Sequence, residues 1–475
     1  LADFDSDDDG NVPFTANGAP TTLSVPSAVT LLIWENKEFA PGGDITLDSG
    51  GSGGSLEAAT SSAFTAVSGE SHSIGGSLRF GDSATLSAAD ASIDLTSTAA
   101  GEVIDVNEGS FGNLTISGTG DYTVTDSTLT LGSDLTVSAG ALSLPSATTT
   151  IGGSLSNSAT LNATSGILVF DGAGSESLTF GGAAAGDLLF ANTGSWSITD
   201  TNATATRDVT VATGTVTLPG GVFAVGGDVI VTDTITENGG TLALTASGTP
   251  VTLTLNGNDL GSLSLVGSST VTMTDASAAL QGDLTVAAGT LTMATNTVSI
   301  AGSLDATGGR LHTASNTILM NSDDVGETID PGTNIFYNLE IGGAGGGWTL
   351  QSATTTNNFA LLSGASFTLA SGERLSVGNV FTNTLGGGAT TWSGSTLDLG
   401  SGKQYAINSK GDTGDTYDGT VIFGPNTDIE SWNSSFSLPQ VAPSASLYSQ
   451  DDGDLPGELA IYGDFRISTS TEFWS

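Results

Sequence analysis

The chain has 475 residues, and its 50 acidic side chains against 8 basic ones give a net charge of −42. It contains no cysteine, which excludes disulfides, thiolate catalysis and cysteine-ligated metals. A surface this acidic repels nucleic acid and anionic lipid but attracts divalent cations, so the composition favours an exposed extracellular protein.

Residues 1–70 are predicted to form an irregular N-terminal segment that serves as an interface or a cap. In it Asp5, Asp7 and Asp9, followed by a glycine, match the first half of a calcium-binding loop. A complete EF-hand loop would carry Glu where this chain has Ala16. The pattern predicts a Ca²⁺ site at the three aspartates, and the competing interpretation is a solvated acidic terminus.

Residue 1 is Leu rather than Met, and no secretory apolar segment follows it. We therefore expect a mature or excised fragment. The longest early apolar run, residues 29–34, is far too short to cross a bilayer. No membrane span is expected in this chain.

A polar residue followed by an apolar one recurs with a period of about 75 residues. It occupies three positions in each repeat, here called slots. The first slot holds Asn113, Asp187, Ser262 and Asn338, the second holds Asp134, Asp208, Asp283 and Asn358, and the third holds Ser154, Asp228, Ser303 and Asn379. A glycine before a strand keeps the same period at Gly140, Gly214, Gly289 and Gly364. Four registers that share one period indicate a true repeat.

The residue after each slot is apolar, as in Leu135, Leu155, Leu284 and Leu304. Around the slots, apolar and polar residues alternate, which is typical of strands with one buried face. The slots lie about 20, 20 and 34 residues apart, and 20 residues suit one coil of a β-solenoid. We predict an all-β, right-handed parallel β-solenoid of ~20-residue coils grouped in ~75-residue compound repeats. Each repeat is expected to contain two short coils and one longer coil.

The alternative is a string of immunoglobulin-like sandwiches, because about 75 residues is near that domain size. A sandwich has no 20-residue sub-period, however, and the 67 glycines suit tight coil corners better than sandwich strands. The solenoid is the favoured prediction.

Residues 71–400 are predicted to be the solenoid, and residues 401–475 a C-terminal β-rich module with more aromatic and proline residues. We expect this module to be an assembly interface. The chain ends near the aromatic pair Phe473 and Trp474, which are costly to leave in water. Together with Phe4 they are candidate contacts in end-to-end assembly, in which residues 459–475 pack against residues 1–50 of the next copy.

Catalysis is not expected. The basic residues are spread thinly, and Arg207, which directly precedes a slot, is interpreted as part of a surface ion pair. Asp134, Asp208 and Asp283 recur at one slot because turns favour such residues, which makes a glycosidase carboxylate pair the weaker interpretation. The two histidines, His72 and His312, lie far apart and form no metal motif.

Two segments, residues 111–118 and 131–144, resemble the repeats of very large bacterial surface proteins, the haemagglutinin-like and autotransporter-like β-solenoid adhesins. The closing residues 459–467 and 472–474 are similar to segments of giant repeat proteins from uncultured small-genome bacteria. The likeness implies a secreted or surface-anchored fibrous protein that needs no cofactor.

These observations lead to three functional hypotheses. The first is a structural, non-enzymatic subunit of a cell-surface filament or sheath, whose partners are copies of itself. The second is an adhesin stalk that binds surface glycans or neighbouring cells. The third and weakest is a β-helix enzyme acting on polysaccharides. Ordered, interlocking ends would favour the first, and exposed aromatic residues and carboxylates gathered in one groove would favour the others.

Overall fold

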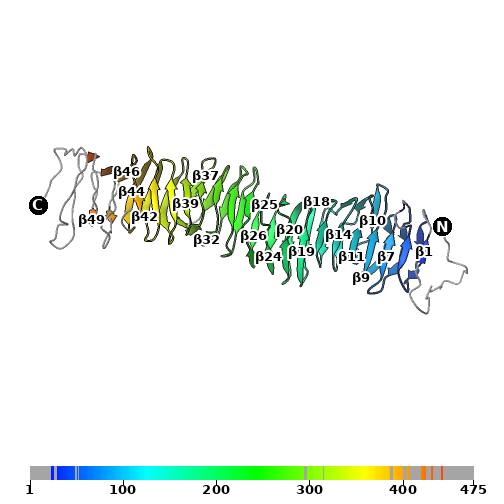
Figure 1. Cartoon of the computed structure of the whole chain (residues 1–475). Coiled ribbons are helices and arrows are strands. Elements are labelled where there is room, and N and C mark those ends of the chain that lie inside the picture. Colours follow the sequence, from blue (N-terminus) through cyan, green and yellow to red (C-terminus); the bar gives the residue numbers. More distant parts are fainter. Residues whose placement is uncertain are drawn as a thin grey trace, which may run out of the picture. The chain divides into compact units, whose positions relative to one another are not determined.

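The computed structural model describes residues 23–25, 29–48, 51, 53–293, 297–313, 315–385, 389–399, 404–406, 419–423, 429–431 and 440–441. Their regular elements are all strands, paired in parallel (Figure 1). No helix in this part of the chain could span a bilayer. The chain divides into two compact units, residues 1–240 and residues 241–475.

The strands of the first unit are β1 Leu23–Val25, β2 Leu31–Ile33, β3 Glu38–Phe39, β4 Ile45–Leu47, β5 Leu56–Ala58, β6 Ala63–Thr65, β7 Ser71–Ile74, β8 Leu78–Phe80, β9 Thr85–Leu95, β10 Glu102–Asp105, β11 Ser110–Ile116, β12 Asp121–Val124, β13 Thr128–Leu131, β14 Leu135–Val137, β15 Ala141–Ser143, β16 Thr148–Ile151, β17 Leu155–Asn157, β18 Thr160–Phe170, β19 Ser175–Thr179, β20 Ala184–Phe190, β21 Ser195–Ile198, β22 Ala203–Ala205, β23 Val209–Val211, β24 Thr215–Thr217, β25 Val222–Val225, β26 Val229–Val231 and β27 Thr234–Thr236.

The strands of the second unit are β28 Thr241–Leu244, β29 Val251–Thr254, β30 Ser262–Leu265, β31 Thr270–Met273, β32 Ser277–Leu280, β33 Leu284–Val286, β34 Thr290–Met293, β35 Thr297–Ile300, β36 Leu304–Asp305, β37 Arg310–Thr313, β38 Thr317–Asn321, β39 Val325–Asp330, β40 Ile335–Gly342, β41 Gly347–Leu350, β42 Thr354–Leu361, β43 Ser366–Leu369, β44 Arg374–Asn383, β45 Thr390–Thr391, β46 Thr396–Leu399, β47 Gln404–Ala406, β48 Thr420–Phe423, β49 Ile429–Ser431 and β50 Gln440–Val441.

Each coil runs through three faces, and it crosses each face as a short strand or as part of a longer strand such as β18, which pairs with both β15 and β16. From the end of β11 the chain forms β12 and β13 and then returns as β14, which pairs with β11. In this pairing Leu114 lies beside Leu135, one coil later. The predicted parallel β-solenoid is therefore confirmed, and it has about 18 turns.

The core consists of rows of like residues that stack along the solenoid. Leu135 lies beside Leu155 in the next coil, and Leu284 lies beside Leu304. All four side chains are completely buried. The alternation of buried and exposed residues explains the sequence pattern, because only every second side chain of a strand points inward. These pairings confirm the predicted leucine rows and exclude separate sandwich domains.

The third interval of each repeat is not one long coil, so that part of the prediction is wrong. Leu155 lies beside Leu178, whereas Leu188, which follows the next slot, lies beside Leu168 on another face. Over the 34 residues from a third slot to the first slot of the next repeat, the chain thus completes one full coil and then crosses two further faces. The second unit repeats this pattern after Leu304. Because about 75 residues is not a whole number of coils, successive repeats begin on different faces.

Candidate functional site

The slot residues join neighbouring coils through hydrogen bonds at the corners of the solenoid. The Asp134 N–H donates to Asn113 Oδ1 at 3.1 Å, and the Ser154 N–H donates to Asp134 Oδ1 at 2.8 Å. In the third repeat, Ser262 Oγ accepts from the Asp283 N–H at 2.9 Å. A slot therefore needs a short side chain with an acceptor oxygen, which explains the choice of Asp, Asn and Ser.

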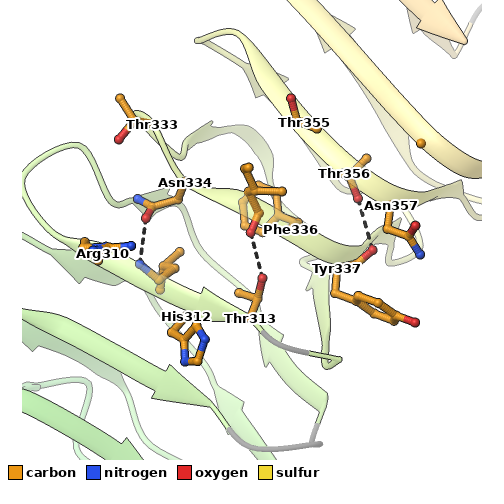
Figure 2. A pocket seen from close by; sticks show the side chains of 13 residues that line it. Arg310, His312, Thr313, Thr333, Asn334, Phe336, Tyr337, Thr355, Thr356 and Asn357 are labelled. Atoms are coloured by element: carbon orange, nitrogen blue, oxygen red, sulfur yellow. Dashed lines mark hydrogen bonds between the residues drawn. The ribbon is translucent and has the colours of Figure 1, made fainter. Parts of the chain in front are cut away.

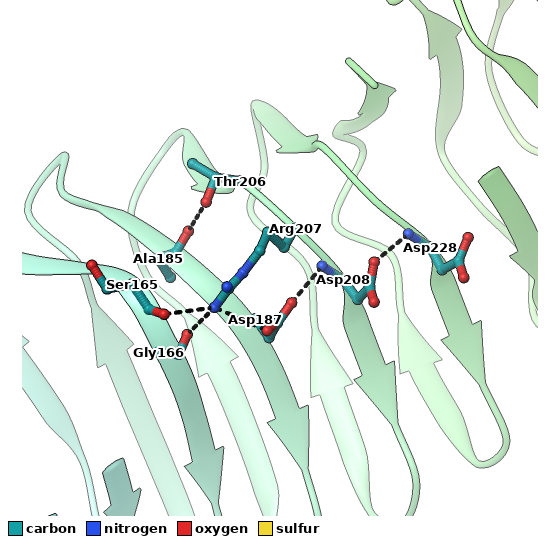
Figure 3. A network of polar contacts seen from close by, with 8 residues as sticks. All are labelled: Ser165, Gly166, Ala185, Asp187, Thr206, Arg207, Asp208 and Asp228. Atoms are coloured by element: carbon teal, nitrogen blue, oxygen red, sulfur yellow. Dashed lines mark hydrogen bonds and ion pairs between the residues drawn. The ribbon is translucent and has the colours of Figure 1, made fainter. Parts of the chain in front are cut away.

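Figure 3 shows this arrangement in the second repeat, where three aspartates follow one another. Asp208 donates its backbone N–H to Asp187 Oδ1 at 3.0 Å, and Asp228 donates to Asp208 Oδ1 at 2.8 Å. The structure thus places the sequence-predicted Asp208 in a structural ladder. Asp134 and Asp283 hold the same position in their own repeats.

Arg207 offsets the negative charge of this aspartate row. Its Nη2 lies 3.0 Å from Asp187 Oδ2 and donates to the carbonyl oxygens of Gly166, at 2.7 Å, and Ser165, at 3.2 Å (Figure 3). The arginine side chain is 44% exposed, so the pair is screened by solvent and contributes little to stability. The predicted surface ion pair is confirmed.

In the first and third repeats, the last slot residue is a serine that pairs with a glutamate of the next coil. Ser154 Oγ accepts the Ser177 N–H at 3.1 Å and donates to Glu176 at 2.9 Å. Ser303 makes the corresponding contacts with the Thr328 N–H and Glu327. The carboxylate accepts a hydrogen bond from the serine hydroxyl. The lone pairs of the serine oxygen therefore remain free to accept a backbone N–H of the next coil.

The residue before a slot is usually glycine, because the corner leaves no room for a side chain. In the first three repeats this holds for seven of the nine positions, namely Gly112, Gly153, Gly186, Gly227, Gly261, Gly282 and Gly302. A Cβ at Gly302 would contact Asp283 Oδ1 and would lie 2.7 Å from the backbone carbon of Gly282. Gly378, which precedes the last slot, differs, since a Cβ there would meet nothing closer than 3.7 Å.

We expect Gly302→Ala to lower the free energy of unfolding by about 1–3 kcal/mol, because it forces backbone apart and displaces the Asp283 carboxylate. Gly378→Ala is the matched control, and its effect should stay within about 0.5 kcal/mol. Urea unfolding followed by circular dichroism compares the two variants. Equal losses of stability in the two variants would contradict the argument that a Cβ at Gly302 is too close to its neighbours.

In the fourth repeat, Tyr337 and Asn357 precede the first two slots in place of glycine. The surface there opens into a groove (Figure 2). The groove has a volume of about 790 Å³ and lies over β37, β40, β42 and β44 in the second unit. Arg310 and His312 line it from β37, and Tyr337 and Asn357 line it from the corner.

An interrupted backbone ladder between β37 and β40 accompanies the groove. The Leu311 N–H donates to the side chain of Asn334, at 2.9 Å, rather than to a backbone carbonyl. The Ile335 carbonyl accepts from Thr313 Oγ1 at 2.7 Å (Figure 2). Side chains thus satisfy the backbone where the two strands are not joined by a regular ladder.

The exposed side chains of the groove combine apolar and polar character. Ile335 is 61% exposed and Tyr337 is 39% exposed. Thr355, Asn357 and Arg310 add hydroxyl, amide and guanidinium groups. A surface that offers an aromatic ring beside several hydrogen-bonding groups can bind a small polar ligand.

Sequence reasoning did not find this groove. The available signal was the departure from the repeat, since Tyr337 and Asn357 stand where the other repeats mostly carry glycine. The two histidines are in different units: His72 is buried on β7, and His312 is exposed on β37.

The metal and assembly residues predicted from the sequence lie outside the described residues. These are Asp5, Asp7 and Asp9 for Ca²⁺ and Phe4, Phe473 and Trp474 for the interface. In the described ranges no group of three or more His, Asp or Glu side chains could hold a metal ion. The calcium site and the aromatic interface stay predictions.

Comparisons with protein-family models, with curated proteins and with solved structures gave no match to this chain.

Proposed function

We propose that this chain is a structural subunit of an extracellular, cell-surface filament or sheath that assembles end to end. The observation that carries the proposal is the edge formed by the first described coil. Its strands β1, β2 and β3 pair with the strands of the following coil, as in Leu23 with Ile45, Leu31 with Leu56 and Phe39 with Phe64. Their opposite edges form the end of the described solenoid.

The edge of β2 has its hydrogen-bonding groups arranged for a further strand. The Leu31 N–H donates to Ser55, and the Ile33 carbonyl accepts from Ala59, so both residues face the following coil. Leu32 lies between them, and its N–H and C=O point the opposite way because successive residues of a strand alternate. Such an edge pairs readily with another strand.

A copy of the same solenoid would supply that strand, and a head-to-tail contact of this kind grows into a filament. Aromatic contacts of Phe4, Phe473 and Trp474 belong to this proposal. The alternative within it is covalent continuity, in which this segment is one unit of a longer chain and the next unit follows Ser475 directly. The net charge of −42 opposes association of copies, so screening by salt or Ca²⁺ should promote it.

We expect filaments of the purified protein at about 0.15 M salt, where charges more than about 8 Å apart are largely screened. Negative-stain microscopy and light scattering, with and without Ca²⁺, provide the measurement. Leu32→Pro should stop elongation while leaving the coil bonds intact, because proline removes only the outward N–H. Leu32→Ala, which keeps that N–H, is the control. A monodisperse protein under all these conditions would favour the adhesin stalk instead.

The second candidate function is an adhesin stalk that binds glycans. The groove at Tyr337 favours it, because the exposed Tyr337 ring lies there beside polar side chains such as Thr355 and Asn357. The likeness of residues 111–118 and 131–144 to bacterial surface adhesins points the same way. An enzymatic role has no comparable support.

A further inference from the structure

The groove on β37 and β40 contains an arginine that has no side-chain partner among the residues that the structure describes. Among the described residues, Arg207 and Arg374 form ion pairs with Asp187 and Asp398. Arg310 is exposed and makes no ion pair or side-chain hydrogen bond within the described part of the chain. In a protein with a net charge of −42, an unpaired guanidinium in a groove indicates a site for an anion.

The neighbouring side chains restrict the kind of anion. His312 lies two residues from Arg310 on β37, so both point to the same side, about 6.7 Å apart along the strand. Tyr337 lies at the other end of the groove from Arg310 in Figure 2. A ligand that contacts both must be extended and must offer an anionic group at one point and an apolar face at another.

A sugar chain that carries carboxylates meets these requirements. A pyranose ring has an apolar face of C–H groups, which packs on the electron-rich face of an aromatic ring such as Tyr337. Its hydroxyls match the uncharged donors and acceptors of Thr355 and Asn357. A uronate carboxylate accepts two parallel hydrogen bonds from the guanidinium of Arg310.

Other extended anions fit less well. A nucleic acid backbone is usually held by several Lys or Arg side chains, whereas Arg310 is the one such side chain among the residues that line the groove. A peptide that adds as a strand needs free backbone groups. In the gap between β37 and β40, the Leu311 N–H and the Ile335 carbonyl are already bonded to Asn334 and Thr313.

We propose that this groove binds an acidic oligosaccharide, with a uronate carboxylate paired to Arg310 and a sugar ring packed on Tyr337. The proposal gives the ligand class for the adhesin function and does not depend on end-to-end assembly.

The test titrates the full chain with tetragalacturonate and with its fully methyl-esterified form, by calorimetry in a chelating buffer that prevents calcium bridging. The acid form should bind at least about tenfold more tightly than the ester, and Arg310→Gln should abolish that preference. Tyr337→Ser should weaken both forms by a similar factor. Arg374→Gln is the matched control. It removes the same positive charge from an arginine that already pairs with Asp398, so it should leave binding unchanged.

Three outcomes would overturn the proposal. The first is no binding of either form. The second is an equal loss of affinity in Arg310→Gln and Arg374→Gln, which would show diffuse charge attraction only. The third is binding of a hexaglutamate peptide as tightly as tetragalacturonate with no effect of Tyr337→Ser, which would assign the groove to an acidic peptide. Microscopy of the same variants reports filament formation separately, so failure of one proposal is distinguishable from failure of the other.

Discussion

Leu284→Ala should lower the free energy of unfolding by about 2–5 kcal/mol. Leu284 is completely buried in the second unit and lies between Leu263 and Leu304 of the adjacent coils. Truncation leaves a cavity that the neighbouring coils cannot fill, because both are held by their own backbone ladders. Urea unfolding followed by circular dichroism measures the loss.

The control for this prediction is Thr285→Ala, next to Leu284 on the same strand. Thr285 points outward, beside Ser264 and Asp305, so its loss should stay within about 0.5 kcal/mol. Because each coil contacts only its neighbours, hydrogen exchange should accelerate chiefly around residues 263–304. An equal loss of protection throughout the second unit would argue against local coil-to-coil stability.

The fold could be predicted because its determinants are local and repeated. The slot residues and the leucines after them recur visibly, and the structure stacks Leu135 on Leu155 as the period indicates. The faces could not be assigned from that period alone. Whether Leu188 stacks on Leu155 or on Leu168 depends on how many faces the chain crosses in the third interval. The alternation of apolar and polar residues does not distinguish these cases, because it is the same on every face.

The groove was harder to predict, because it results from an interruption rather than a pattern. Tyr337 alone is an exposed tyrosine, and only the interrupted ladder between β37 and β40 makes it part of a concave surface. That interruption depends on the side chains of Asn334 and Thr313 replacing backbone partners. Sequence periodicity has no means of showing such a replacement.

A buried histidine gives the first unit a specific sensitivity to acid. His72 stands in an inward-facing row, beside Ile93 of the next coil, and is completely buried. Its Nδ1 accepts the Ile45 N–H at 3.2 Å, and its ring meets Phe64 edge-on. Burial lowers the pKa of His72 from 6.5 to about 4, although the nearby Asp44 carboxylate opposes the change. Glu70 Oε2, 3.6 Å from Nε2, is the other acidic group beside the ring.

We expect the first unit to lose stability as the pH falls from about 6.5 to about 4. In this window the unfolded chain protonates His72 while the folded chain keeps it neutral, so acid favours unfolding by up to about 3 kcal/mol. His72→Gln retains an acceptor for the Ile45 N–H but cannot titrate. The difference in unfolding free energy between wild type and variant, measured at pH 7 and pH 5, removes the contribution of the many carboxylates. Between pH 7 and pH 5, this difference should change by about 2 kcal/mol, with the variant relatively more stable at pH 5. A difference that does not change with pH would show that His72 is not held neutral in the core.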